Sequence, residues 1–177
     1  EHIPNLRTGN ADGKMVTTET DGEKAEVLNS YFAGVFTNED PLSIPGFQDC
    51  SGGQVLAELD ISRQQITDKI NKLKVDKSPG LDGVHPRVLV ELKNEISEPL
   101  HIIFCNSMEK GKLPREWKMA NITALYKKDD KTLPGNYRPI SLISILCKLL
   151  ESILSDHIVG YMKSNKLFDN NQYGFLK

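Results

Sequence analysis

The sequence predicts an α+β protein that is mainly helical and has a small β-sheet. Apolar residues recur at helical spacing through most of the chain, whereas residues 120–126 form a short apolar run with β-branched side chains. With 177 residues, 38% apolar and 26% charged, the chain has the size and composition of one ordinary globular domain.

Residues 1–60 are predicted to be an acidic lead-in, separate from residues 61–177. Residues 1–20 lack apolar periodicity, so we expect loose chain with a short hairpin around Asp12-Gly13. Residues 38–60 are rich in proline and glycine, which favours a turn-rich connector and places the domain boundary at its end.

An amphipathic helix is expected within the lead-in, from about Glu23 to before Pro41. Its apolar side chains fall at helical spacing, so they share one face that must be buried. That face consists of Ala25, Leu28, Phe32, Val35 and Phe36.

A second helix is predicted by a capping signal at Ser62. Gln65 stands three residues later, and Ile61 and Ile66 are placed for a hydrophobic staple. The expected buried face consists of Ile66, Ile70 and Leu73. The lysines expected to point toward water or phosphate are Lys69, Lys72, Lys74 and Lys77.

Residues 78–83 are predicted to form a sharp loop, because proline fixes one dihedral angle and two glycines permit conformations closed to other residues. Helix is expected to resume after Pro86, to restart at Pro99 and to end at Gly111. The residues expected to face the core are Val88, Leu89, Leu92, Ile96, Leu100, Ile103, Phe104 and Met108.

Residues 120–126 are predicted to be a strand, residues 127–131 its turn, and residues 135–142 an extended segment containing Pro139. A last long helix is expected to follow. Its expected core face consists of Ile145, Leu149, Leu150, Ile153, Leu154, Ile158 and Met162.

The three cysteines, Cys50, Cys105 and Cys147, indicate reduced core thiols, because an odd number cannot all pair and their spacing does not fit a zinc clip. No apolar run reaches the roughly 18 residues of a membrane span, and residues 1–4 lack the layout of a signal peptide. We therefore expect no membrane partner and a cytoplasmic or nuclear location.

Charge is divided unevenly along the chain. Residues 1–60 carry 3 Lys or Arg against 11 Asp or Glu, a net −8, and residues 61–177 carry 19 against 13, a net +6, which together give −2. Residues 110–128 contain six cations and a single acid, Glu116. Such clustering is typical of proteins with a phosphate-rich partner, although a solvated face is the commoner explanation. These cations are Lys110, Lys112, Arg115, Lys118, Lys127 and Lys128.

Lys127 and Arg138 are candidates for binding a triphosphate. Lys127 follows the predicted strand and Arg138 comes eleven residues later, so a hairpin-like reversal would bring both to one surface. Lysine offers a mobile point charge and arginine a rigid fork that grips phosphate oxygens. From the residues alone, the alternative of a surface lysine and an arginine paired with a local carboxylate stays open.

Other candidate chemistry has less residue support. Asp129-Asp130 is the only adjacent acidic pair after residue 60, but neighbouring lysines favour a solvated turn over a metal site. Gly80 to Gly83 has the spacing of a GXXG nucleic-acid clamp, yet Asp82 disfavours phosphate, so we expect a structural loop. The four histidines are far apart and predict no metal site, and no hydrolase, P-loop or dinucleotide motif occurs.

Four ordered motifs resemble those of the reverse transcriptases of non-LTR retrotransposons. They are Lys77 to Gly83; Leu113 to Lys118 with Asn121 to Thr123; Asn136 to Leu142 with Lys148 to Glu151; and Asn171 to Phe175. Lys24 to Asn29, with Phe32, resembles the segment that precedes the polymerase in jockey-like elements. The resemblance covers nearly the whole chain, although Leu176 stands where the family often has Arg or Thr.

The resemblance implies a right-hand polymerase, of which this chain is the fingers region and the beginning of a truncated palm. Lys127 and Arg138 match the fingers lysine and arginine that contact the triphosphate of the incoming dNTP. The residues implied to contact nucleic acid are Lys77, Ser78, Gly80 and Gly83 along the template, and Lys110, Lys112, Arg115 and Lys118 along the backbone. The implied partners are an RNA template, a DNA primer, dNTP, and the palm and thumb of the same polymerase.

The family's catalytic carboxylates belong to palm motifs that would follow Lys177. They hold the two Mg²⁺ ions that activate the attacking hydroxyl and neutralise the leaving pyrophosphate. The resemblance therefore implies Mg²⁺ in the full-length parent, none bound by this chain, and no polymerisation by this chain alone. Two alternatives stay open: a non-catalytic nucleic-acid-binding or helical interaction module derived from a retroelement, and a product that does not fold stably without the palm.

Overall fold

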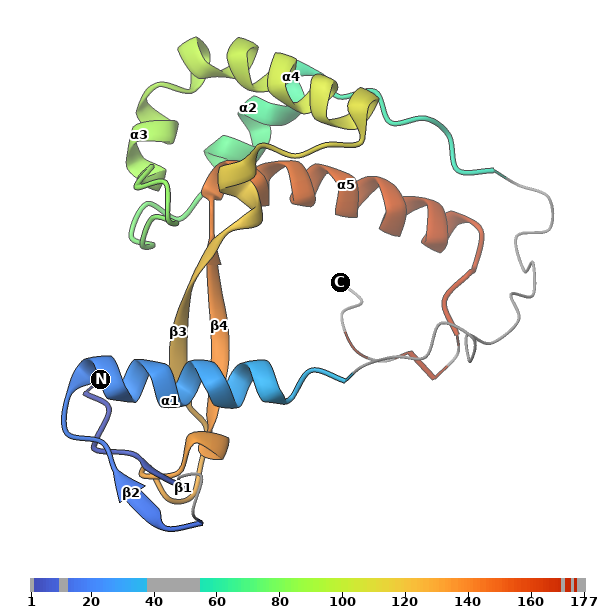
Figure 1. Ribbon diagram of the computed structural model, residues 1–177. Coiled ribbons are helices and arrows are strands. Elements are labelled where there is room, and N and C mark those ends of the chain that lie inside the picture. Colours follow the sequence, from blue (N-terminus) through green and yellow to red (C-terminus); the bar gives the residue numbers. More distant parts are fainter. Residues whose placement is uncertain (1, 10–12, 38–54, 170, 173, 175–177) are drawn as a thin grey trace. The chain divides into compact units, whose positions relative to one another are not determined.

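The computed structural model describes residues 2–9, 13–37, 55–169, 171, 172 and 174. Within these residues the chain is α+β, about half helical, with two small antiparallel sheets of two strands each (Figure 1). The predicted α+β class is confirmed. No helix in the described part is both long and apolar enough to cross a membrane.

The chain forms two compact units. Unit 1 consists of Glu1–Pro45 and Ile122–Ser141, and unit 2 consists of Gly46–Asn121 and Leu142–Lys177. Residues 122–141 thus group with the N-terminal segment, although they are far from it in sequence. The predicted domain boundary at residue 60 stays a prediction, and most of the connector predicted there, together with Cys50, lies outside the described residues.

The first sheet, in unit 1, is the short hairpin predicted near Gly13. Strand β1 (Arg7–Gly9) pairs antiparallel with β2 (Met15–Thr17). The segment is not loose, however, because Leu6 is fully buried and its N–H donates to Thr18 Oγ1 at 2.8 Å. One apolar residue among polar neighbours carried no periodic signal, and the sequence therefore gave no reason to expect this anchor.

Helix α1 (Asp21–Gly34) begins earlier than predicted. Thr20 and Glu23 form a capping box that the prediction missed, and the N–H groups of Glu19 and Thr20 lower the pKa of Glu23. Val35 and Phe36 lie beyond the helix end and are 58% and 82% exposed, so the expected buried face is shorter than predicted.

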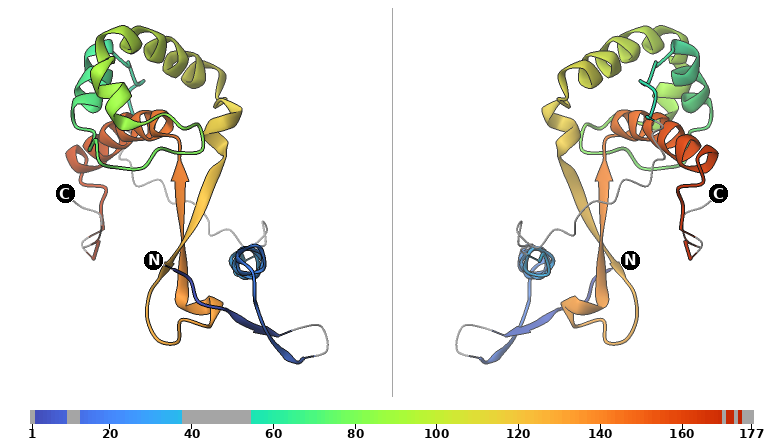
Figure 2. Two further views of the ribbon diagram at one scale, coloured as in Figure 1. Left: turned by 90° about the vertical axis from the view of Figure 1, so that its left-hand side faces the viewer. Right: turned by 90° about the vertical axis from the view of Figure 1, so that its right-hand side faces the viewer.

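The described part of unit 2 contains four α-helices. Helix α2 (Arg63–Asn71) packs against both α4 (Lys93–Lys110) and α5 (Ile145–Ser164), and the short α3 (Pro86–Glu91) precedes α4 (Figure 2). Their buried side chains form one apolar core. It consists of Ile61, Ile66, Ile70, Leu89, Leu100, Phe104, Trp117, Ile145, Cys147, Leu149, Leu150 and Ile153.

The start of α2 follows the prediction, but one of its lysines does not. Ser62 and Gln65 form the predicted capping box, and Ile61 and Ile66 are both buried in the core. Lys69, predicted to point toward water or phosphate, is instead 15% exposed and pairs with Asp156 at 2.6 Å. Its long stem lets the amine reach α5 across the apolar contact between the two helices.

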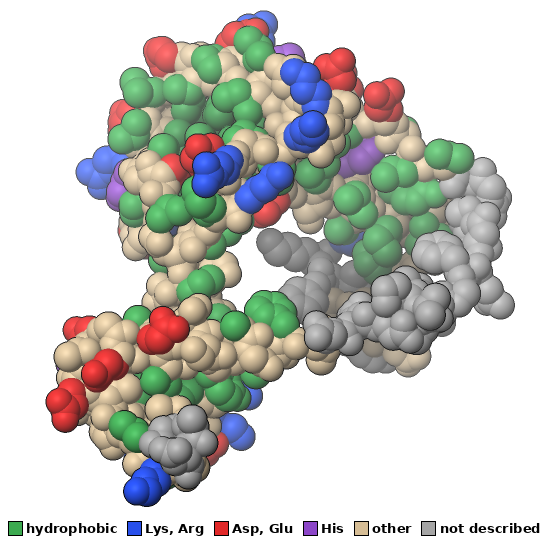
Figure 3. Space-filling view, viewed as in Figure 1, with side chains coloured by type: hydrophobic (Ala, Val, Ile, Leu, Met, Phe, Trp, Pro, Cys, Tyr) green, Lys and Arg blue, Asp and Glu red, His purple; other side chains and the backbone are tan. Residues whose placement is uncertain are grey.

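The break between α3 and α4 is at Leu92, and the predicted restart at Pro99 is wrong. Pro99 lies inside α4, where it removes one backbone hydrogen bond without ending the helix. Spacing carried across the break placed Val88 and Leu92 on a buried face, whereas Ile103 and Met108 lie beside the buried face of α4, which runs through Leu100 and Phe104. From α3 to the end of α4, four residues predicted to be buried are exposed, namely Val88, Leu92, Ile103 and Met108, and in α5 the predicted core residue Ile158 is 44% exposed. Figure 3 shows hydrophobic side chains gathered on the face of unit 2 that it presents to the viewer.

Cys105 and Cys147 are free thiols, as predicted. Burial, with the Glu151 carboxylate beside it, raises the pKa of Cys147 to about 11. At pH 8 this leaves about 0.1% thiolate, against roughly a quarter for an ordinary cysteine of pKa about 8.5. We therefore expect iodoacetamide to label Cys147 at least 100-fold more slowly in the native chain than in urea, measured by peptide mass spectrometry. Equal labelling in the two states would contradict the buried, protonated thiol.

Candidate nucleotide and nucleic-acid interface

The two candidate triphosphate-binding residues belong to the second sheet. Strands β3 (Ala120–Tyr126) and β4 (Tyr137–Ile143) are hydrogen-bonded neighbours of equal length, as expected for the predicted strand and extended segment. The N–H of Lys127 donates to the carbonyl of Asn136 at 2.8 Å, which continues the pairing past Tyr126. Tyr126 therefore lies opposite Tyr137, and their rings meet edge to face with centroids 5.9 Å apart.

Side chains alternate along this pair and so give it two faces. Ala124 and Pro139 are on the face that lines a groove of about 980 Å³ with α1. Lys127 and Arg138 fall on the other face, and both are exposed. The register makes them diagonal neighbours across the pair, for which roughly 7–8 Å is the usual separation. The reversal that the sequence predicted is present, while the role of the two cations stays a prediction.

Neither cation is engaged elsewhere in the described part of the chain. The ion pairs there involve other basic residues, namely Arg7, Lys24, Arg63, Lys69 and Lys128. The alternative in which Arg138 pairs with a local carboxylate therefore has no support among the described residues. An arginine and a lysine left exposed on one face can both turn toward an anionic ligand.

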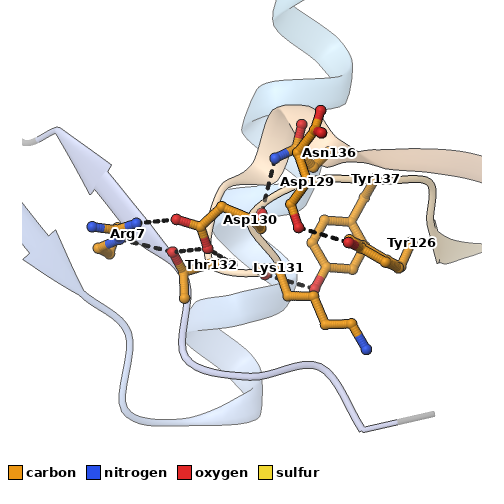
Figure 4. A network of polar contacts seen from close by, with 8 residues as sticks. All are labelled: Arg7, Tyr126, Asp129, Asp130, Lys131, Thr132, Asn136 and Tyr137. Carbon is orange, nitrogen blue, oxygen red and sulfur yellow. Dashed lines mark hydrogen bonds and ion pairs between the residues drawn. The ribbon is translucent and has the colours of Figure 1, made fainter.

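Backbone carbonyls in the loop between β3 and β4 accept hydrogen bonds from both tyrosines (Figure 4). Tyr126 Oη donates to the carbonyl of Asp129 at 2.6 Å, and Tyr137 Oη donates to that of Lys131 at 2.7 Å. Asp129 has φ of +67°, a left-handed conformation that Asp tolerates better than most residues. The predicted turn is therefore an ordered loop.

Asp130 lies in the turn, as predicted, but it is not simply solvated. It accepts hydrogen bonds from the N–H and Oγ1 of Thr132, at 2.8 and 2.7 Å, and it pairs with Arg7. The Thr132 N–H, then its hydroxyl and the Arg7 charge, lower the pKa of Asp130 below its ordinary value. Nothing in the sequence linked Arg7 to this carboxylate.

The other basic candidates belong to one segment of unit 2. Gly111 ends α4 with φ of +59°, as predicted, and a 3₁₀ turn, η2 (Arg115–Lys118), follows. Trp117 holds this turn to α4, because its buried ring packs edge to face on Phe104 at 5.8 Å. The exposed cations of the segment are Lys110, Lys112, Arg115 and Lys118, none of which has an ion-pair partner among the residues described.

The loop predicted at residues 78–83 is fixed to the start of α5. A Cβ on Gly80 would lie 2.5 Å from the carbonyl oxygen of Ile143, so the close approach of two backbones requires glycine there. Gly83 has φ of +70°, and its N–H donates to the carbonyl of Gly80. Asp82 Oδ2 accepts a hydrogen bond from Ser144 Oγ at 2.5 Å.

These contacts agree with the structural loop expected from the residues, and they do not test the template contacts that the resemblance implies. Lys77, Ser78 and Gly83 are exposed, whereas Gly80 is buried. Ser144 also caps α5 by accepting from the N–H of Leu146, which places Asp82 at the N-terminal end of a long helix. A serine before an apolar helical run was the available signal for the cap, but no signal indicated Asp82 as its partner. The predicted template contacts stay predictions.

The described residues form no group of three or more His, Cys, Asp or Glu side chains able to hold a metal ion. Asp129 and Asp130 point to different partners, the first toward Lys128 and the second toward Arg7 and Thr132.

The chain has relatives among polymerases of mobile elements. It is 32% identical over 114 residues to a protein of Drosophila melanogaster named a probable RNA-directed DNA polymerase from transposon BS. It is 28% identical over 116 residues to the RNA-directed DNA polymerase from mobile element jockey of the same species. The homologues of this chain are RNA-directed DNA polymerases of non-LTR retrotransposons.

The relationship to non-LTR polymerases covers only a small part of each relative. The matches to transposon BS and jockey span 63% and 65% of this chain but 12% and 13% of the relatives. A Pol polyprotein from the type-1 element R1 of Bradysia coprophila matches 54% of the chain and 10% of its own length at 32% identity. No protein-family model matches the chain. The resemblance seen in the four sequence motifs is thus confirmed as a relationship to this group.

Proposed function

We propose that this chain is part of an RNA-directed DNA polymerase of a non-LTR retrotransposon, in which it forms the fingers region of a right-hand polymerase. Lys127 and Arg138 bind the triphosphate of the incoming dNTP. The observation that carries this proposal is their placement on one exposed face of the β3–β4 pair, in a chain whose homologues are such polymerases.

Lys127 and Arg138 together suit a triphosphate because a lysine and an arginine contact phosphate in different ways. The Arg138 guanidinium can donate two parallel hydrogen bonds to phosphate oxygens, which fixes the orientation of the ligand. The Lys127 ammonium neutralises charge on a neighbouring phosphate. The pairing of Tyr126 with Tyr137 and the loop hydrogen bonds hold the two backbones in register, so that little ordering remains when the nucleotide binds.

The exposed basic residues of unit 2 are proposed to contact nucleic acid. Lys110, Lys112, Arg115 and Lys118 follow the phosphate backbone, while Lys77, Ser78, Gly80 and Gly83 lie along the template RNA. In the complete polymerase, Mg²⁺ would supply charge neutralisation at the reacting phosphate. No step of this proposal passes through a metal held by the described residues.

Replacing both Lys127 and Arg138 by alanine is expected to weaken dATP binding at least 10-fold, because both charge-assisted contacts are lost. Fluorescence anisotropy of a labelled dATP with the 177-residue chain measures this. The control is the pair Arg63→Ala and Lys166→Ala, which removes the same two residue types from unit 2. The control should bind dATP as the wild type does.

A parallel titration with an RNA–DNA duplex separates the competing functions. Duplex binding should weaken as salt rises, and the double variant should leave it nearly unchanged. Weaker duplex binding with unchanged dATP binding would favour a nucleic-acid-binding module, in which the two cations serve the backbone. A wild-type chain that binds neither ligand would contradict the proposed function.

A further inference from the structure

Arg7, in the N-terminal hairpin, makes three contacts with the loop between β3 and β4. Its backbone N–H donates to the carbonyl of Thr132 at 2.7 Å, and its Nε donates to Thr132 Oγ1 at 2.7 Å. Its Nη2 pairs with Asp130 Oδ2. The guanidinium therefore acts as a fork that holds a hydroxyl and a carboxylate together, although more than a hundred residues separate the partners in sequence.

Asp130 is the centre to which these contacts converge. One carboxylate oxygen accepts from both groups of Thr132, and the other accepts from Arg7. The backbone carbonyl of Asp130 accepts from Asn136 Nδ2 at 2.9 Å, and the carbonyl of Asn136 accepts from the N–H of Lys127 at 2.8 Å. A continuous series of hydrogen bonds thus joins the Arg7 side chain to the backbone of Lys127.

Arg7 is itself held by a fixed backbone. Leu6 is fully buried beside Tyr137, and Leu6 and Thr18 exchange hydrogen bonds across the base of the hairpin. Arg7 directly follows Leu6. The contacts of Leu6 therefore fix the backbone of Arg7 without any contribution from the Arg7 side chain. The side chains of Arg7 and Asp130 remain 47% and 41% exposed, and an ion pair of that kind adds little to global stability.

We infer that Arg7 is a positioning residue for the triphosphate-binding face, because it clamps the β3–β4 loop and so fixes Lys127 against Arg138. The inference rests on the proposed function of these two cations. It gives the N-terminal hairpin, which contains Arg7, a role in nucleotide binding. Loss of the clamp should leave the fold intact but populate loop conformations that do not bind, which lowers the apparent affinity by the competent fraction.

The test measures loop order and dATP binding in the same variants of the 177-residue chain. Arg7→Ala is expected to speed hydrogen exchange at the Thr132, Asn136 and Lys127 amides about 10-fold. It should also raise the Kd for labelled dATP about fivefold, as a loop competent roughly one fifth of the time would do. The urea midpoint should stay near that of wild type.

Three further variants separate positioning from general damage. Arg7→Lys keeps the charge but loses the fork, so it should restore part of the dATP affinity. The double variant Arg7→Ala, Asp130→Ala should be no worse than Asp130→Ala alone, because the two residues act together. The matched control is Arg63→Ala, which removes the exposed ion pair between Arg63 and Glu98 in unit 2. It should change neither hydrogen exchange in the β3–β4 loop nor dATP binding.

The outcomes distinguish this inference from the function on which it rests. A wild-type chain that binds no dATP would overturn the proposed function. A wild-type chain that binds dATP, together with an Arg7→Ala chain that binds it equally well, would overturn only the positioning role, whether or not loop exchange rises.

Discussion

Replacement of Gly80 by alanine is expected to destabilise unit 2 by about 3 kcal/mol, the upper part of the range for overpacked sites. The added Cβ would lie 2.5 Å from the carbonyl oxygen of Ile143 and 2.8 Å from the Cα of Ser144. Both are backbone atoms at the junction of β4 and α5, and they cannot turn aside as the end of a flexible side chain can. The loop must therefore move away, and the contact between Asp82 and Ser144 should be lost with it.

Urea unfolding followed by fluorescence measures this effect directly. The chain has a single tryptophan, and Trp117 is buried in the core of unit 2. The matched control is Gly160→Ala, which adds the same methyl group inside α5 where no atom lies within 4 Å. That control should stabilise the helix by roughly 0.5–1 kcal/mol. A Gly80→Ala chain as stable as the wild type would show that the two backbones are not held this close.

The same contact determines how the template proposal should be tested. Because Gly80 is buried against the β4–α5 junction, its substitution would change the fold and any nucleic-acid contact together. Lys77 is exposed and has no ion-pair partner among the described residues, so its substitution would test RNA binding without touching this packing. Weaker RNA binding in a Gly80 variant alone would therefore say nothing about the template.

Local signals in the sequence predicted local structure well. The capping box at Ser62 and Gln65 joins residues three apart, so both partners are visible in one short window. The same is true of the strand at residues 120–126 and of the glycine that ends α4, each of which depends on its immediate neighbours. Lys127 and Arg138 could be placed on one face because a short reversal links them.

Three side-chain contacts could not be predicted, because each joins residues far apart in sequence. Lys69 reaches Asp156, Arg7 reaches Asp130, and Asp82 reaches Ser144 across 87, 123 and 62 residues, respectively. Each partner is one of many polar residues, and residue type alone does not indicate which of them the fold brings near. A second cause of wrong predictions is a break in a helix. Val88 and Leu92 were predicted to be buried from helical spacing that crosses the break between α3 and α4, and both are exposed.

Replacing Phe104 by alanine is expected to cost about 3–5 kcal/mol, the usual range for a large aromatic side chain removed from a core. Phe104 is fully buried between α4 and its neighbours, and its ring packs on Trp117. Its removal would leave a cavity lined by other buried residues of the core. Urea unfolding monitored by circular dichroism measures the loss.

Ile102→Ala is the matched control, since Ile102 lies in the same helix and is 52% exposed. It should cost no more than about 1 kcal/mol, because little apolar surface is lost from the core. A comparable loss in the two variants would contradict the assignment of these faces of α4.

The Phe104 variant also bears on the basic segment that follows α4. Phe104 holds Trp117, and Trp117 lies within the turn that carries Arg115 and Lys118. With the ring gone, the Trp117 fluorescence should shift to longer wavelength while the chain is still folded, because the indole meets more water. RNA binding should then weaken in Phe104→Ala but not in Ile102→Ala if the cations act as one ordered surface. Unchanged RNA binding in both variants would mean that Lys110, Lys112, Arg115 and Lys118 contribute only their charge, whatever the position of the turn.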